Sequence, residues 1–372
     1  MADGSVMVRD AGRFYDAGPT TELFVATGHM GRSIISCDDG QSWVADESDL
    51  DAFRCFRGGG NPDGGSAGCD HNEGTNRGGV FVNGAFVSTF GYDAPGSVRR
   101  SLDGVEWSRV VEATSFAALV AGTNGVLLAA SRTPSWSTDN GLSFKPGEEA
   151  RFEWMGNRLD DVRFAASVPG IFAMYAEGVF GPAIHSDLQL AVDGGQHWEH
   201  VDLPVECGAR ASIGFSGGGG RLLYIDQASA CVSSDGRTFT AHALPAYAEK
   251  GPMWSGTGFL VWGTRGNPTY ESVVMRSPDG AVWSAEKATT RTALGDGGIE
   301  LTRGPYVGPV ARSADGTFVT VNSDFNASYE RQQFYRSTDG ATWDALPAPA
   351  FSGSHPLISI AWGRAKTPFV CR

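Results

Sequence analysis

Three histidines in three separate segments of the chain are candidate metal ligands. His29 lies in "ATGHMGRS", His71 in "GCDHNEG" and His355 in "SGSHPL". Three imidazoles from separate loops can bind zinc or copper and leave one coordination position open for a substrate. Asp70 or Glu73, on either side of His71, would orient a ligand or act as general base. Because no HxH or HExxH spacing accompanies them, the alternative is a set of exposed loop histidines without metal.

Arginines lie close in sequence to the same acidic residues and indicate a site for a carboxylate. The stretch "AFRCFRGGGNPDGGSAGCDHNEGTNRGG" contains Arg54, Arg57 and Arg77. A guanidinium group can donate two parallel hydrogen bonds to a carboxylate, so these residues are candidate ligand-binding residues. The alternative is a loop whose charges are only solvated. Glycines 58–60 do not form a phosphate loop, because no helix pattern follows them.

These residues are compatible with three functions. The first is an enzyme, metal-assisted by copper or zinc, built on the three histidines with Asp70 or Glu73. The second is a non-catalytic module that binds a glycan or a peptide through Tyr92, Trp254, Trp262 and the loop arginines. The third is a glycoside hydrolase with two carboxylates about 5 to 10 Å apart.

The elements that must position these residues come from a repeat. Seven short segments share a serine, an aspartate, a glycine and an aromatic residue at nearly constant spacing. They are "SCDDGQSW" (36–43), "SLDGVEW" (101–107), "STDNGLSF" (137–144), "AVDGGQHW" (191–198), "SSDGRTF" (233–239), "SPDGAVW" (277–283) and "STDGATW" (337–343).

A second recurring unit precedes the segments, a glycine turn followed by a strand pattern, as in "NGAFVSTF" and "TGFLVWGT". Each repeat therefore reads as four antiparallel strands whose last two are joined by the Asp-Gly turn. Seven such units predict an all-β, seven-bladed β-propeller formed by a single domain over residues 1–372. N- and C-terminal strands are expected to share blade 1, with residues 352–372 completing it. Both "PFVCR" and "ELFVATG" fit its second strand.

The seven segments resemble the Asp-box (BNR) repeat S-x-D-x-G-x-x-W of sialidases, sortilin-type receptors and xyloglucanases, over nearly the whole chain. Four segments are one residue shorter, and one has Ala191 in place of serine, so weaker hydrogen bonding is expected in these turns. The resemblance implies that the segments are structural and lie opposite the ligand face. Sialidases also have six blades and an F-R-I-P-like motif, whereas this chain has "GRFYDAG". Tyr92, Tyr329 and Glu330 are candidates for a catalytic tyrosine and its glutamate, without a motif to place them.

Long intervals between segments locate the expected ligand face. In a propeller of this topology, the loops between strands two and three and between blades gather on one face. A four-stranded blade leaves extra residues in several intervals, and long ordered loops are commonly functional. We expect a ligand pocket on this face near blade 1. The insertions are residues 48–77, 145–161, 176–187, 286–306 and 323–332.

Six cysteines without a CxxC pair favour disulfides over a zinc ribbon. Cys55 and Cys69 flank the glycine-rich loop, and a bridge between them would stabilise the fold by roughly 3 kcal/mol. Cys37 and Cys371 would bridge the composite blade. Disulfides imply an oxidising compartment, so we expect a secreted or periplasmic protein whose signal peptide is absent from this sequence. Six reduced thiols are the alternative.

Charge and hydropathy restrict the partners. The net charge of −13 opposes binding to a phosphate backbone, and no cluster of basic and aromatic residues compensates for it. No stretch approaches the roughly 20 apolar residues of a membrane span. We therefore expect a small-molecule, glycan or peptide ligand rather than nucleic acid.

Overall fold

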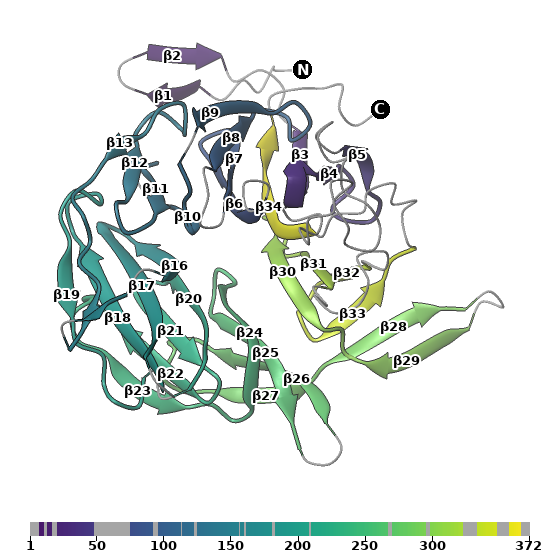
Figure 1. The fold of residues 1–372 in the computed structure, drawn as a ribbon. Helices are drawn as coiled ribbons and strands as arrows, with labels where there is room; N and C mark the ends of the chain where they lie inside the picture. The colour runs from purple at the N-terminus through teal and green to yellow at the C-terminus, as the bar shows by residue number, and fades with distance from the viewer. Residues whose placement is uncertain are drawn as a thin grey trace, which may run out of the picture.

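Seven antiparallel sheets stand around a central channel and form a seven-bladed β-propeller (Figure 1). The computed structural model describes residues 7–10, 13–16, 21–47, 75–91, 96–112, 114–122, 125–155, 157–159, 161–180, 183–207, 210–266, 270–294, 298–322, 333–347 and 357–365. Within these ranges, helical structure is limited to the 3-10 turn η1 (His29–Gly31). No helix in the described part of the chain is long and apolar enough to cross a membrane.

The first four blades have the strand order expected from the repeat, running from the channel outward. Blade 1 contains β34 (Leu357–Ala365), β3 (Thr21–Gly28), β4 (Ser33–Ser36) and β5 (Val44–Glu47). Blade 2 contains β6 (Asn76–Val82), β7 (Ala85–Phe90), β8 (Ser97–Ser101) and β9 (Ser108–Glu112). Blade 3 contains β10 (Ala118–Ala121), β11 (Leu127–Ala130), β12 (Ser135–Ser137) and β13 (Lys145–Pro146). Blade 4 contains β16 (Asp161–Val168), β17 (Ile171–Phe180), β18 (Ala183–Ala191) and β19 (Glu199–Val201).

Blades 5 and 6 repeat this order, and blade 7 carries two additional strands. Blade 5 contains β20 (Ser212–Gly218), β21 (Arg221–Asp226), β22 (Ser229–Ser233) and β23 (Thr240–Ala243). Blade 6 contains β24 (Tyr247–Trp254), β25 (Phe259–Arg265), β26 (Glu271–Ser277) and β27 (Ser284–Lys287). Blade 7 contains β30 (Val307–Arg312), β31 (Phe318–Asn322), β32 (Phe334–Ser337) and β33 (Thr342–Ala345), extended by β28 (Thr289–Ala293) and β29 (Ile299–Arg303).

Three hairpins lie outside the four-strand pattern. β1 (Met7–Asp10) pairs with β2 (Arg13–Asp16), and β14 (Glu153–Trp154) pairs with β15 (Asn157–Arg158). The third hairpin, β28–β29, joins blade 7 because β28 pairs in parallel with the outer strand β33, and its two strands project away from the ring (Figure 1). Part of the predicted insertion 286–306 is therefore a regular hairpin.

The second strand of each blade is buried because neighbouring blades cover both of its faces. All six residues of β7 are buried, as are the first six of β25. Their sequences, "AFVSTF" and "FLVWGTR", are continuous runs of apolar and small residues, typical of strands covered on both sides. The cores lie between blades: Trp43 of blade 1, for example, stacks on Phe334 of blade 7 at 3.8 Å between ring centroids. The aromatic residue of this Ser-Asp turn therefore packs between two blades.

The Ser-Asp turns fold as their sequence predicts. In six of them the serine hydroxyl donates to the aspartate, for example Ser337 Oγ to Asp339 Oδ1 at 2.9 Å. The backbone N–H groups of Ala341 and Thr342 donate to the same oxygen at 2.8 and 2.7 Å. The shorter turns keep two such bonds, so the expected loss of hydrogen bonding does not occur. The turn with Ala191 also keeps two, from Gln196 and His197 to Asp193, but it lacks the bonds of the serine hydroxyl, so the weaker hydrogen bonding expected there is found.

These hydrogen bonds hold the turn carboxylates in their charged form. For Asp235, the N–H groups of Thr238 and Arg237 lower the pKa to about 2. A carboxylate that accepts these bonds stabilises the turn, which agrees with the structural role expected for the segments.

The turns also join each blade to the preceding one. Gly104 of blade 2 has φ +79, and a Cβ there would lie 2.5 Å from the Val25 side chain in blade 1. Only glycine allows this approach without strain. In blade 7, Arg336 Nε donates to the carbonyl oxygen of Asp39 in blade 1 at 2.9 Å, and Arg100 makes the equivalent bond to Asn140.

The ring closes through strands from both ends of the chain, as predicted. β3 pairs antiparallel with β34 from Thr21↔Ala365 to Gly28↔Leu357. The segment "ELFVATG" lies in β3 and forms the second strand of blade 1, whereas β34 is its innermost strand. "PFVCR" (368–372) lies outside the described residues.

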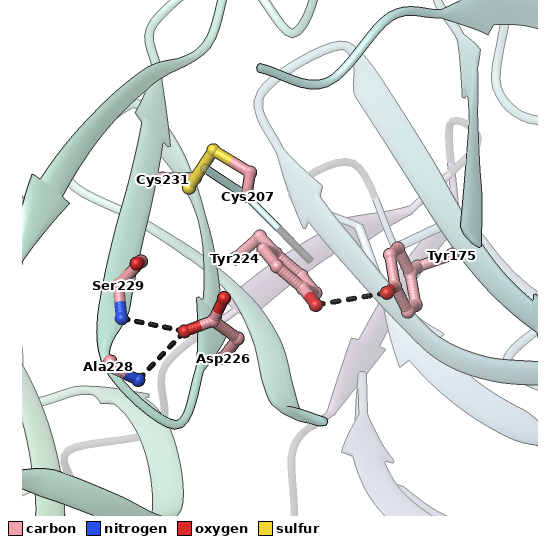
Figure 2. Close-up of a disulfide and its surroundings, with 7 residues drawn as sticks. All are labelled: Tyr175, Cys207, Tyr224, Asp226, Ala228, Ser229 and Cys231. Atoms are coloured by element: carbon pink, nitrogen blue, oxygen red, sulfur yellow. Dashed lines mark hydrogen bonds between the residues drawn. A yellow bond between two sulfur atoms is a disulfide. The ribbon is translucent and has the colours of Figure 1, made fainter. Parts of the chain in front are cut away.

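A disulfide and a buried polar cluster fill the contact between blades 4 and 5 (Figure 2). Cys207 and Cys231 are bonded, and both are buried. Beside them, the hydroxyls of Tyr175 and Tyr224 are 2.9 Å apart, and burial raises the pKa of both phenols. The fully buried Asp226 accepts backbone N–H bonds from Ala228 and Ser229 at 2.8 and 2.7 Å, which compensates for the burial of its carboxylate.

Of the other four cysteines, only Cys37 lies within the described residues. Cys37 is disulfide-bonded, and its partner lies outside the described residues. Cys55, Cys69 and Cys371 lie outside them as well, so the two bridges predicted from sequence stay predictions.

Candidate functional site

A cavity of about 280 Å³ lies between blades 6 and 7. Its wall comes from three strands of blade 6 (β24, β25 and β26), from three strands of blade 7 (β29, β30 and β33) and from the adjoining residues 288 and 304–306. Such a volume accommodates a ligand of roughly monosaccharide size. The lining residues are Glu249, Lys250, Trp262, Gly263, Ser272, Val273, Ala288, Arg303, Gly304, Pro305, Tyr306, Val307 and Trp343.

Two tryptophans form the apolar part of the cavity. Trp262 in β25 is 3% exposed and donates from its indole Nε1 to the carbonyl oxygen of Gly340 at 2.8 Å. Trp343 in β33 is fully buried, and its ring centroid lies 6.2 Å from that of Trp262. Its Nε1 finds no hydrogen-bond acceptor among the described residues. A buried donor without an acceptor is costly, because it has given up its hydrogen bonds to water.

Lys250 is the cationic group of the cavity. It lies in β24 opposite Trp262, where the pairing of β24 with β25 is irregular on both sides of the lysine. No hydrogen bond or ion pair joins its ammonium group to any residue that the structure describes. Desolvation lowers the pKa of Lys250, because burial disfavours the charged amine. A partly buried amine without a counter-ion is a strong attractor for an anion.

Further polar groups come from the chain that follows the hairpin. Arg303 Nε donates to Ser272 Oγ at 2.8 Å, which holds the guanidinium at the cavity. Tyr306 is 55% exposed and adds a third aromatic ring. Glu249, the neighbour of Lys250, accepts the hydroxyl of Thr264 at 2.9 Å. The cavity thus combines two cationic side chains, one carboxylate and three aromatic rings.

A second cavity, of about 340 Å³, is the central channel itself. It is lined by inner strands of blades 1, 2, 3, 5, 6 and 7, and Lys250 lines it as well. Arg77 of β6 and Trp254 of β24 are also in its wall. Gly218 allows Trp254 to pack there, since a Cβ on this glycine would lie 2.1 Å from the indole. The amine of Lys250 therefore stands where the channel meets the cavity between blades 6 and 7.

The structure places two of the residues predicted for the blade 1 site. His29 is buried at 4% exposure in η1, and its Nδ1 accepts the backbone N–H of Asn76 at 2.8 Å. This bond occupies one ring nitrogen of His29 in the contact between blades 1 and 2. Arg77 lines the central channel, as a ligand-binding role requires.

Most of the predicted site residues fall outside the described ranges. They are Arg54, Arg57, Asp70, His71, Glu73, Tyr92 and His355, together with Tyr329 and Glu330. Within the described ranges, no three His, Cys, Asp or Glu side chains are grouped so as to hold a metal ion. The three-histidine metal site therefore stays a prediction.

Sequence analysis missed the charged residues of the cavity between blades 6 and 7. It named Trp262 and Trp254 as ligand-binding aromatics and 286–306 as an insertion, but not Lys250, Arg303 or Glu249. One signal was available: the chain contains four lysines among its 29 basic residues, so a lysine in an inner-strand pattern is unusual for this sequence.

Comparison with known proteins adds little beyond the fold. No family model matches the chain. No curated protein matches it either. Among solved structures, a protein from Lactobacillus plantarum has a TM-score of 0.49 and 9% identity, and the match covers 93% of this chain and 100% of the other.

Two further solved structures show the same level of similarity. YCF48 from Cyanidioschyzon merolae has a TM-score of 0.47 and 13% identity, covering 77% of this chain and 88% of the other. A GH74 xyloglucanase from Xanthomonas campestris has a TM-score of 0.40 and 16% identity, covering 89% and 44%. Similarity at this level carries no information on ligand or activity, which have to be read from the site itself.

Proposed function

We propose that this propeller is a ligand-binding module whose cavity between blades 6 and 7 takes a small carboxylate-bearing ligand with a ring face, such as an acidic sugar. The observation that supports it most directly is Lys250, a partly buried amine in that cavity without a counter-ion among the described residues. A carboxylate supplies the missing charge, and the aromatic rings supply a surface for the ligand ring.

Arg303 and Trp343 support the same ligand chemistry. Arg303 is held at the cavity by Ser272 and keeps further N–H donors for a carboxylate oxygen. The ring of Trp343 adds to the apolar wall against which a ligand ring can pack. An acidic sugar offers a carboxylate, several hydroxyls and an apolar ring face in one molecule.

Isothermal titration calorimetry with D-glucuronate tests this function, with D-glucose as the neutral counterpart. We expect glucuronate to bind more tightly than glucose. Lys250→Met removes a charge-assisted hydrogen bond worth about 1.5 to 3 kcal/mol, so affinity should fall by roughly 10- to 100-fold. Lys287→Met is the matched control, because Lys287 is an exposed lysine of the same blade outside the cavity.

Two results would contradict the proposal. One is that wild-type protein binds neither sugar. The other is that Lys250→Met and Lys287→Met weaken glucuronate binding equally, which would mean that only the overall charge matters.

We further propose that the protein works in an oxidising compartment, secreted or periplasmic, as a member of the Asp-box superfamily. The Cys207–Cys231 disulfide supports the compartment, because such bonds rarely persist in a reducing cytosol. The six serine-aspartate turns support the superfamily assignment, for example the 2.9 Å bond between Ser101 and Asp103.

A further inference from the structure

Lys250 differs from every other lysine that the structure describes. Of the four lysines in the chain, Lys366 lies outside the described residues. Lys145 is exposed, with its Nζ 5.2 Å from the Trp136 ring centroid. Lys287 is exposed and lies 3.9 Å from Glu271. Lys250 alone of these three lines a cavity, and it reaches both the channel and the pocket between blades 6 and 7.

The surroundings of Lys250 favour a neutral, nucleophilic amine. Burial acts against its charged form, and no carboxylate of the described residues forms an ion pair with it. Arg303 and Glu249 line the same cavity, and Arg77 lines the adjoining channel. Desolvation is one condition that activates lysine amines toward carbonyl compounds.

Glu249 is the candidate proton carrier of the cavity. Glu249 lines the same cavity, and its carboxylate is held by the hydroxyl of Thr264 at 2.9 Å. Tyr306 is the remaining titratable side chain of the cavity wall and is largely open to solvent. A carboxylate beside an amine can accept the amine proton and return it to a leaving hydroxyl.

We propose that Lys250 condenses reversibly with a small aldehyde or ketone acid bound in the cavity between blades 6 and 7. Nζ attacks the carbonyl carbon, so that the C–N bond forms as the C=O π bond breaks, and Glu249 carries the first proton from nitrogen to the carbonyl oxygen to give the carbinolamine. Glu249 then carries the second nitrogen proton to the hydroxyl, which leaves as water when the C–O bond breaks and the imine C=N forms. The reverse addition of water restores the amine. This inference rests on the proposed function for the placement of the ligand carboxylate at Arg303.

Trapping with glyoxylate and sodium cyanoborohydride tests the condensation at pH 7. The hydride reduces the imine to carboxymethyl-lysine, which peptide mass mapping assigns to individual lysines. We expect Lys250 to be labelled severalfold faster than Lys145 or Lys287, because its lowered pKa leaves a larger fraction of the amine neutral at this pH. Propionaldehyde, which has no carboxylate, should label Lys250 with a smaller preference.

Two variants identify the groups responsible. Lys250→Arg keeps a positive charge but has no nucleophilic amine, so glyoxylate labelling at this position should disappear. Glu249→Gln keeps the shape but cannot carry the proton, so labelling of Lys250 should slow severalfold. Circular dichroism of each variant shows that it is folded.

The outcomes separate this inference from the proposed function. If glucuronate binds but glyoxylate labels Lys250 no faster than Lys287, the condensation is wrong and the binding function stands. If Lys250 is labelled selectively but glucuronate does not bind, the amine is reactive as inferred and the acidic-sugar ligand is wrong. Equal labelling by glyoxylate and propionaldehyde would overturn the carboxylate part of the inference.

Discussion

The same repeat forms the contact between blades 4 and 5 and the contact between blades 6 and 7. The buried polar groups have hydrogen-bond partners in the first contact, whereas two of them lack partners among the described residues in the second. Between blades 4 and 5, a disulfide is buried, the two tyrosine hydroxyls bond to each other, and Asp226 accepts two backbone N–H groups. Between blades 6 and 7, a cavity of about 280 Å³ remains, with the unpaired amine of Lys250 and, among the described residues, an indole N–H of Trp343 without an acceptor.

This difference separates a stabilising contact from a binding contact. Buried polar groups with partners contribute to stability, whereas buried polar groups without partners reduce it. The contact between blades 4 and 5 is tightly bonded, whereas Lys250, which has no ion-pair partner among the described residues, lines a cavity between blades 6 and 7. Stability and binding are therefore expected to respond to mutation in different blades.

The largest effect is expected from the disulfide between blades 4 and 5. The bond closes a loop of 24 residues. Cys207→Ala with Cys231→Ala should lower the free energy of unfolding by roughly 3 kcal/mol, because the unfolded chain regains its loop entropy. Urea denaturation followed by tryptophan fluorescence measures this. A loss below about 1 kcal/mol would show that the contact does not depend on the bridge.

A smaller loss is expected from the tyrosine pair. Tyr224→Phe removes the hydroxyl that lies 2.9 Å from Tyr175, and it should lower the free energy of unfolding by about 1 kcal/mol. Tyr335→Phe in blade 7 is the matched control, because the hydroxyl of Tyr335 has no hydrogen-bond partner among the described residues. If both variants lose equal stability in urea denaturation, the proposed contrast between the two contacts is wrong.

The smallest effect, and one of opposite sign, is expected at Lys250. Lys250→Met replaces an unpaired, partly buried amine with an apolar side chain, so it should raise the free energy of unfolding at pH 7 by roughly 0.5 to 1 kcal/mol. The low pKa of Lys250 in the folded state, caused by desolvation, means that the unfolded chain binds more protons. The stability advantage of Lys250→Met over wild type should therefore shrink as pH rises from the folded-state pKa toward 10.5.

Urea denaturation of both proteins at pH 7 and pH 9.5 measures this difference. Lys287→Met should differ little from wild type at either pH, because its side chain is exposed. A stability difference between Lys250→Met and wild type that grows with pH would mean that the folded state favours the charged amine.

Ring closure was only partly predictable from sequence. The composite blade followed from the repeat, because strands at both ends of the chain lacked a complete set of partners. Which strand occupied the second position did not follow, since "ELFVATG" and "PFVCR" have equivalent apolar patterns. The pairing of β3 with β34 makes "ELFVATG" the second strand of blade 1, and this pairing joins residues more than 300 positions apart.

The sequence by itself determined the turns and hence the blades. Each Ser-Asp turn is held by hydrogen bonds between residues at most four positions apart, such as the bond from the N–H of Gly40 to Ser36 Oγ. The local sequence is therefore sufficient to form the turn. Only the tertiary structure decided the site. Lys250, Trp262, Arg303 and Trp343 belong to four strands of two blades, and none carries a local pattern that points to the others. Their meeting depends on how the blades pack around the ring, because a binding cavity is a property of side chains brought together from distant positions.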